Sequence, residues 1–125
     1  MERLGFWKDL VRQGLKTPVE APGDTRSDCH AWGSHPLFHL FASVAGIGPA
    51  SPGFRSVEVA PQPGRYRHIA ARLPHPDGEI AVNLRFDKGT CRGEVQLPEG
   101  IRGRLKWAGR STPLAPGSNA FDTLP

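Results

Sequence analysis

Cysteine is scarce in this sequence, and long hydrophobic runs are missing altogether. Cys29 and Cys91 are the two cysteines among 125 residues, too few and too widely spaced for a disulfide framework or a zinc cluster. No run approaches the roughly 18 apolar residues of a membrane span. The opening MERLGFWKDLVRQ lacks the apolar core of a signal peptide. We therefore expect no metal, no cofactor and no membrane, and the cytoplasm is the default where the sequence leaves the compartment unknown.

Glycine, proline and basic residues are plentiful instead. The 15 Gly and 13 Pro indicate many turns and short strands, while 38% hydrophobic and 22% charged residues are typical of a soluble globular chain. Sixteen Lys and Arg exceed twelve Asp and Glu, giving a net charge of +4. Residues 1–48 carry five basic and five acidic side chains, and residues 49–125 carry eleven and seven. The positive excess therefore lies in the second part.

The hydrophobic pattern of the first part is helical. Residues 2–13 predict an amphipathic helix that ends at Gly14. A Pro- and Gly-rich loop follows, and a second helix is expected from Ser27 or Asp28, either of which could cap it, to about Ala45. Apolar residues cover much of the circumference of this second helix, so we expect partners beyond this chain to bury it.

The hydrophobic period changes to two after Pro52-Gly53. Strands are predicted at 54–59, 69–73, 80–86, 95–97 and 101–107, with further strands near Leu114 and Phe121. Turn residues separate them at 76–78, 87–89 and 98–100. Short strands at this spacing are typical of an antiparallel β-sandwich.

The segment between the two helices carries most of the candidate chemistry. Glu20 is either a general base on the loop or a solvated loop acid. His30, between Cys29 and Trp32, is either a functional histidine beside an aromatic ring or a structural one. Asp28 has an equally good explanation as a helix cap.

Two further arrangements in this part offer weaker chemistry. Cys29 could act as a nucleophile beside His30, but adjacent residues do not normally face each other and no third partner is evident. His35 and His39 are spaced i, i+4 and could share a metal, but no third ligand lies at a matching interval.

A row of basic residues alternates along one predicted strand. Arg102, Arg104 and Lys106, with Arg110 beyond the next turn, could bind nucleic acid or could simply guard a sheet edge in water. The interleaved aromatic residues of single-strand binders are missing. We therefore expect no nucleic-acid partner.

Several segments, taken in order, resemble the C-terminal end of bacterial α-L-rhamnosidases (glycoside hydrolase family 78). These are TPVE at 17–20, SDCHAW at 27–32, AGIGPASPGF at 45–54 and VAPQPG at 59–64, followed by the hairpin at 74–80. The chain differs from the family's pattern at Pro18-Val19, before Glu20, and at Gly33, where the family tends to have Ser.

The resemblance implies an α+β fold made of two parts. Such enzymes are inverting glycoside hydrolases built on an (α/α)6 barrel that is followed by a small C-terminal β-domain. Residues 1–48 would be the last helices of that barrel, and residues 49–125 would be the antiparallel β-sandwich domain.

The resemblance also implies roles for matched residues and a missing part. Glu20 would be the general base, and His30 and Trp32 would belong to the wall that holds the rhamnosyl unit of a terminal α-L-rhamnoside. The family's general acid would lie in barrel segments upstream of Met1, so this chain would need that N-terminal barrel portion and would be inactive alone. The alternative is a stand-alone β-sandwich module that binds carbohydrate or protein without catalysis.

Overall fold

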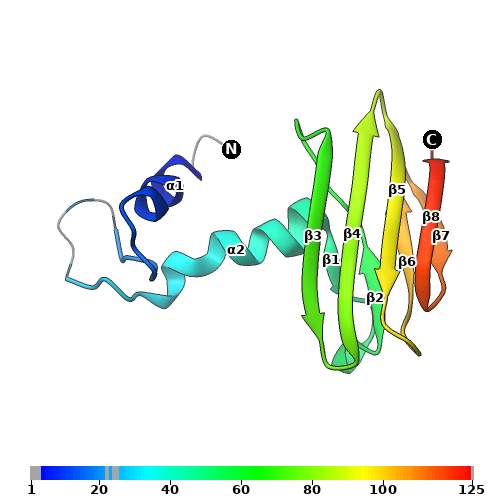
Figure 1. Cartoon of the computed structure of the whole chain (residues 1–125), viewed down its shortest axis with the longest axis horizontal. Helices are drawn as coiled ribbons and strands as arrows, with labels where there is room; N and C mark the ends of the chain where they lie inside the picture. Colours follow the sequence, from blue (N-terminus) through cyan, green and yellow to red (C-terminus); the bar gives the residue numbers. More distant parts are fainter. Residues whose placement is uncertain (1–3, 22, 24–25, 125) are drawn as a thin grey trace. The chain divides into compact units, whose positions relative to one another are not determined.

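The computed structural model describes residues 4–21, 23 and 26–124. The chain divides into two compact units, residues 1–39 and residues 40–125 (Figure 1). The domain boundary after residue 48 that the sequence suggests stays a prediction.

The first unit contains helix α1 (Gly5–Arg12), the 3-10 turn η2 (Ala31–Ser34) and the short helix α2 (His35–His39). Gly14, the predicted stop, follows α1 with a φ of +80°, a left-handed conformation that glycine adopts readily. The indole Nε1 of Trp7 donates a hydrogen bond of 2.7 Å to the carbonyl of Gly33 and so ties α1 to η2. No helix in the described part of the chain has the length and apolarity to cross a membrane.

The second helical segment begins later than predicted. Its first turn starts at Ala31, because the preceding His30 has an extended backbone (φ −122°, ψ 113°). No side chain caps this turn. Ser27 and Asp28 therefore lie in the loop, and the prediction that one of them caps the helix was wrong. The helical turns continue through α2 into η3 (Leu40–Ala45), a π-helical turn with which the second unit begins.

The predicted end of this segment near Ala45 is confirmed, and Gly46 explains it. Gly46 has a φ of +71°, and a Cβ at this position would lie 2.1 Å from the carbonyl carbon of Ala60. The Ala60 N–H in turn donates to the Gly46 carbonyl at 2.8 Å. The chain therefore leaves the helix through a residue for which a side chain has no room.

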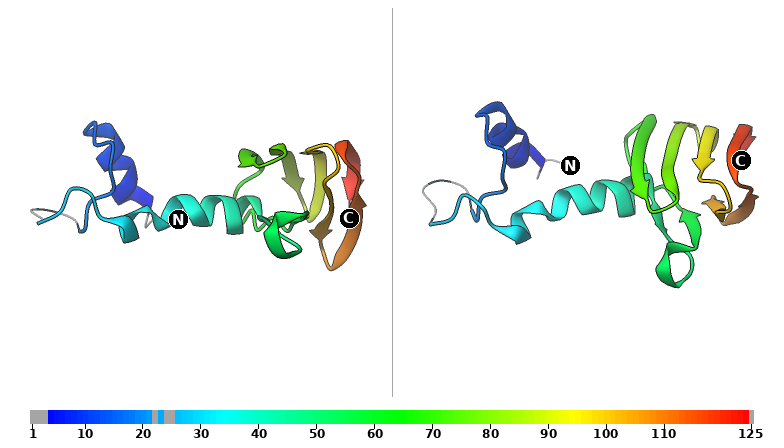
Figure 2. Two further views of the ribbon diagram at one scale, coloured as in Figure 1. Left: turned by 90° about the horizontal axis from the view of Figure 1, so that it is seen from below. Right: turned by 60° about the horizontal axis from the view of Figure 1, so that its bottom comes forward.

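The second unit is built from two four-stranded sheets. Its strands are β1 (Ile47–Pro49), β2 (Ser56–Val59), β3 (His68–His75), β4 (Gly78–Asp87), β5 (Thr90–Leu97), β6 (Arg102–Trp107), β7 (Arg110–Leu114) and β8 (Gly117–Leu124), with the 3-10 turn η4 (Pro52–Phe54) before β2. One sheet has the order β1-β2-β6-β7 and the other β3-β4-β5-β8. Figures 1 and 2 show the two sheets facing each other as layers of a sandwich.

The strand pairing is mixed rather than purely antiparallel. Every pair in the β3-β4-β5-β8 sheet is antiparallel, but β2 and β6 pair in parallel, with Val57 opposite Gly103 and Val59 opposite Leu105. The chain leaves β2, builds three strands of the other sheet, and returns at β6 in the same direction. The antiparallel prediction was therefore right for one sheet and incomplete for the other.

The core lies between the sheets, where the predicted alternation places it. In β4, Ile80, Val82, Leu84 and Phe86 are all buried, as the period of two predicted. The buried core comprises Ala45, Ile47, Val57, Val59, Ile69, Ile80, Val82, Leu84, Phe86, Cys91, Val95, Leu97, Ile101, Leu105 and Leu114. Each large side chain buried in this way is worth about 1.5–3 kcal/mol, so this layer holds the sandwich together.

Proline marks three of the four sheet edges. Pro49 lies on β1, Pro74 on β3 and Pro113 on β7, and all three strands are terminal in their sheets. A proline has no N–H to donate, so it is tolerated at an edge and weakens pairing with any further strand.

Candidate functional site

A hydrogen-bonded loop in the first unit brings the candidate residues together. The N–H of His30 donates to the carbonyl of Pro18 at 2.8 Å, and the N–H of Glu20 donates to the carbonyl of Ser27 at 3.0 Å. The Thr17 hydroxyl also donates to the carbonyl of Asp28. Two of the segments that carry the family resemblance, 17–20 and 27–32, are therefore joined through their backbones.

Glu20 is held by an ion pair on this loop. The guanidinium of Arg26 donates from Nε to both carboxylate oxygens, at 3.1 and 3.0 Å, and from Nη2 to Oε1 at 2.9 Å. The Glu20 side chain is 18% exposed, whereas that of Arg26 is 82% exposed. The carboxylate is thus mostly covered and fixed in orientation by a partner that itself stands in solvent.

His30 and Trp32 form an aromatic pair at the start of η2. Their ring centroids lie 4.7 Å apart with the planes tilted by 41°. His30 is half-buried, while Trp32 is 67% exposed. The pair therefore offers a ring edge and a large open aromatic surface, which is the kind of surface that packs against the apolar face of a sugar ring.

The loop also contains a buried apolar side chain. Val19, between Pro18 and Glu20, is the one core hydrophobic residue of the described first unit. Its neighbours Pro18 and Glu20 make the backbone bonds to the opposite segment. Val19 is therefore buried between the two backbone hydrogen bonds that join this segment to residues 27–30.

The structure gives little support to Cys29 as a nucleophile or to a metal shared by His35 and His39. Cys29 is exposed, and the neighbouring His30 ring packs with Trp32. The rings of His35 and His39 lie 5.9 Å apart, and His35 Nδ1 contacts the carbonyl of Trp32 at 2.7 Å. Among the described residues, no group of three His, Cys, Asp or Glu side chains is placed to hold a metal ion.

The basic row on β6 is exposed as predicted, but it is partly neutralised. Glu58 on the neighbouring β2 contacts Arg104 Nε at 2.6 Å and Lys106 Nζ at 2.9 Å through the same oxygen, Oε2. Hydrogen bonding by Lys106, and next by Arg104, holds the pKa of the Glu58 carboxyl below its usual 4.5. Part of the positive charge that the sequence suggested for this face is thus engaged within the protein.

Sequence reasoning missed Arg26 as a partner of Glu20. The two residues lie six positions apart, across a Pro- and Gly-rich loop whose path no periodicity describes. Opposite charges flanking such a loop are the one signal that could have suggested the pair. The roles of Glu20, His30 and Trp32 themselves stay predictions.

The sandwich matches a known family of domains. Residues 46–120 match the family described as "Bacterial alpha-L-rhamnosidase C-terminal domain". This range begins at the end of the helical segment and reaches into β8, so it covers nearly the whole of both sheets. No curated protein matches the chain.

Three solved structures share its fold. They are native alfa-L-rhamnosidase from Aspergillus terreus (TM-score 0.75, 19% identity, 92% of this chain and 15% of that one), the Streptomyces avermitilis alpha-L-rhamnosidase complexed with L-rhamnose (0.68, 19%, 90% and 14%) and the alpha-L-rhamnosidase from Dictyoglumus thermophilum (0.67, 17%, 88% and 16%). At these identities the likeness shows the fold. The chain spans 14–16% of the length of these proteins.

Proposed function

This chain belongs to the bacterial alpha-L-rhamnosidase C-terminal domain family, and from that premise we propose that it is the C-terminal portion of an inverting hydrolase of terminal α-L-rhamnosides. The observation that carries the proposal is the extent of the likeness. The match to the Aspergillus terreus structure covers 92% of the chain, which is more than the sandwich unit of residues 40–125 alone. The likeness therefore reaches into the helical unit, whose α1, η2 and α2 would be the last helical elements of an (α/α)6 barrel.

In this proposal Glu20 is the general base. Its carboxylate is largely covered and is oriented by Arg26. A carboxylate has about four lone-pair positions, so contacts with one guanidinium leave room to accept a proton from a water molecule. General bases of this kind typically contribute about 10²–10⁴-fold to a rate.

His30 and Trp32 would form part of the wall around the rhamnosyl unit. The backbone bond from His30 to Pro18 places this pair on the same loop system as Glu20. The open face of Trp32, 67% exposed, suits contact with the C–H face of a sugar, while the His30 ring can exchange hydrogen bonds with hydroxyl groups.

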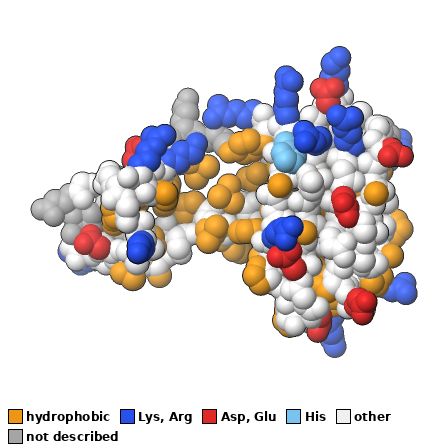
Figure 3. Space-filling model, in the orientation of Figure 1, with side chains coloured by type: hydrophobic (Ala, Val, Ile, Leu, Met, Phe, Trp, Pro, Cys, Tyr) orange, Lys and Arg blue, Asp and Glu red, His pale blue; other side chains and the backbone are white. Residues whose placement is uncertain are grey.

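The proposal also implies a missing partner. Inversion requires a second carboxyl group, the general acid, about 6.5–9.5 Å from the base, and the family resemblance assigns it to barrel segments absent from this chain. The helical segment exposes Trp32, Leu37 and Phe38 by 67%, 62% and 66%, and Figure 3 shows hydrophobic side chains gathered over α2. Those segments of the barrel would cover this face and supply the acid.

A chimera tests the catalytic part of the proposal. This chain would replace the corresponding C-terminal residues of the Dictyoglumus thermophilum enzyme, and hydrolysis of an aryl α-L-rhamnoside would be measured. We expect the 125-residue chain alone to be inactive, the chimera to be active, and Glu20→Gln to lower kcat by about 10²-fold or more. Glu99→Gln, on an exposed turn of the sandwich, is the matched control and should leave kcat unchanged. A folded chimera in which Glu20→Gln keeps full activity would refute the role of Glu20.

The second candidate function is a stand-alone module that binds carbohydrate or protein. The sandwich has prolines at three of its four sheet edges and a buried core between its sheets, and both features favour independent folding. The exposed apolar residues on η2 and α2 favour the fragment instead, because large apolar patches on a stable monomer are uncommon. Sizing of the purified chain separates the two: self-association relieved by Phe38→Ser supports the fragment, and a soluble monomer supports the module.

A further inference from the structure

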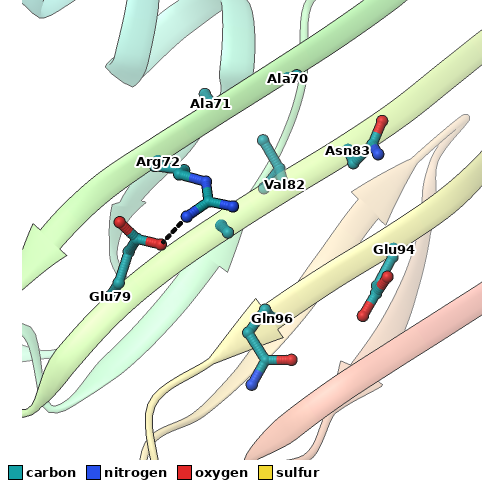
Figure 4. Close-up of a pocket in the computed structure, with 9 residues that line it drawn as sticks. Ala70, Ala71, Arg72, Glu79, Val82, Asn83, Glu94 and Gln96 are labelled. Carbon is teal, nitrogen blue, oxygen red and sulfur yellow. Dashed lines mark hydrogen bonds and ion pairs between the residues drawn. The ribbon is translucent and has the colours of Figure 1, made fainter.

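The outer face of the β3-β4-β5-β8 sheet contains a hollow that has no part in the proposed hydrolase function. Its volume is about 610 Å³, and it is lined by residues of β3, β4 and β5. Ligand sites typically occupy about 300–1,000 Å³, so its size suits one small molecule. Figure 4 shows the lining residues, with Arg72 and Glu79 directed toward each other.

The hollow exists because small side chains occupy its centre. Ala81 on β4 lies opposite Arg72 on β3 and opposite Gln96 on β5. Along β4, the residues two positions away on the same face are Glu79 and Asn83. Four long polar side chains therefore surround one methyl group, and we call these four residues the polar ring.

Alanine methyl groups form the floor of the hollow, and polar side chains form its rim. A second alanine and a second carboxylate belong to them. Ala70 on β3 lies opposite Asn83, and Glu94 on β5 lies opposite the same residue from the other side. Both Ala70 and Glu94 line the hollow. The floor thus combines two methyl groups, while the rim combines two carboxylates, two amides and one guanidinium.

Several rim groups are held by neighbours. Arg72 Nη1 donates to Glu79 Oε1 at 3.2 Å, and the Ser118 hydroxyl on β8 donates to Glu94 Oε1 at 2.6 Å. Asn83 Oδ1 contacts His68 Nε2 at 2.8 Å, which leaves its NH₂ group as a donor. These contacts favour particular rotamers of the rim side chains, which reduces the side-chain entropy lost when a ligand binds.

The chemistry of the rim selects the class of ligand. The lining has one cationic and two anionic side chains, so its charge disfavours phosphates and other anions. Carboxylate oxygens accept from hydroxyl groups, and amide NH₂ and guanidinium groups donate to them. The lining contains no aromatic ring, so planar bases gain no stacking there. A neutral polyhydroxylated molecule with a small apolar face matches both rim and floor.

We propose that this hollow binds a neutral sugar unit, with its hydroxyl groups on the polar ring and Glu94 and its C–H face on Ala81 and Ala70. This site goes beyond the proposed hydrolase function, since it uses none of Glu20, His30 and Trp32 and serves to hold carbohydrate rather than to cleave it. Affinity in the millimolar range is expected from hydrogen bonds without stacking.

Side-chain amide signals in ¹⁵N spectra of the full 125-residue chain give the test. L-rhamnose is titrated first, with D-glucose and D-galactose as further neutral probes and D-glucuronate as an anionic probe. We expect saturable shifts of the NH₂ signals of Asn83 and Gln96 with at least one neutral sugar and weaker shifts with glucuronate. No saturable shift with any neutral sugar up to about 100 mM, or tighter binding of glucuronate, would overturn the proposal.

Two substitutions locate the binding. Ala81→Leu fills the centre of the polar ring on a strand face that tolerates larger residues, and it should weaken binding at least tenfold. Ser111→Leu adds the same side chain at an exposed position of β7 in the other sheet and should leave binding unchanged. If Ala81→Leu is folded and binds as well as the wild type, the sugar lies elsewhere and the proposal is wrong. Because the test needs no hydrolysis, failure of the chimera experiment leaves it intact.

Discussion

Gly33 lies directly against Pro18. A Cβ built on Gly33 would come within 2.9 Å of Pro18 Cβ and within 2.6 Å of the Val19 carbonyl oxygen. Real Cβ atoms do not approach other atoms so closely, so position 33 has room only for glycine beside Pro18. The glycine accommodates the proline, and the loop that carries Glu20 closes without displacement.

A serine in place of Gly33 should loosen the loop. In Gly33→Ser, the added side chain must push Pro18 and Val19 away, at a cost typical of overpacking, about 1–3 kcal/mol. We expect faster amide hydrogen exchange at His30 and Glu20, whose N–H groups bond across the loop. Gly5→Ala, with nothing within 4 Å of its new Cβ, is the control. Unchanged protection at both amides in Gly33→Ser would contradict this packing.

His75 should be a stabilising residue of the sandwich. Its side chain is 2% exposed, its Nε2 contacts the Phe54 carbonyl at 2.9 Å, and the Asp77 N–H donates to its Nδ1 at 3.1 Å. The ring thus joins η4 to the β3–β4 hairpin. His75→Ala leaves both backbone groups without this partner, so the free energy of unfolding should fall by about 1–3 kcal/mol, measured by urea denaturation. The exposed His68, changed to Ala, should have a much smaller effect.

The two thiols should differ sharply in reactivity. Cys29 is exposed and Cys91 is buried, and burial raises the pKa of the Cys91 thiol from 9.0 to about 11. At pH 8 a disulfide reagent should label one thiol quickly and the second only on unfolding. Cys29→Ser should abolish the fast phase. Rapid labelling of Cys91 in the native protein would mean that β5 opens far more easily than its burial indicates.

The same thiol should make stability depend on alkaline pH. The unfolded thiol ionises near 9.0 and the folded one near 11, so its contribution is complete below pH 9 and is lost between pH 9 and 11. In Cys91→Ala the fall in unfolding free energy across this window should be shallower than in the wild type. Parallel curves for the two proteins would show that other groups cause the fall.

Glu58 should contribute at neutral pH and lose its contribution in acid. Its pKa is lowered below 4.5 by Lys106 and Arg104, so the stabilisation is present above pH 4.5 and is lost as the pH falls through the lowered value. Because Arg104 and Lys106 are 46% and 48% exposed, Glu58→Gln should lower the unfolding free energy at pH 7 by less than about 1 kcal/mol. High salt and low pH should both reduce the difference from the wild type. Glu99→Gln should show no such dependence.

The sequence predicted the strands well where burial decides the pattern. In β4 every second residue must face the core, so the alternation from Ile80 to Phe86 identifies both the strand and its inner face. β1 escaped prediction because Ile47-Gly48-Pro49 contains two poor strand residues, and it forms through pairing with β2. The parallel pairing of β2 with β6 depends on the path of the whole chain, which no local pattern encodes.

The structure of the loop that carries Glu20 was harder to predict from the sequence, because turns and ion pairs hold it and the residues show no hydrophobic period. Thr17–Glu20 and Ser27–His30 are joined by backbone bonds that any residues could make. Their pairing therefore leaves no mark on hydrophobicity. The residues alone left two interpretations each for Glu20 and His30, and the family resemblance assigned roles to Glu20, His30 and Trp32. The structure adds the contacts made by Arg26, Val19 and Gly33.

The prolines at the sheet edges have a consequence for how the protein behaves at high concentration. With Pro49, Pro74 and Pro113 on three of the four edges, copies of this chain are poor templates for strand addition, which is the step that builds cross-β fibrils. Association, where it occurs, should proceed through apolar side chains and yield amorphous, redissolvable particles. Thioflavin fluorescence should accordingly stay low even in turbid samples.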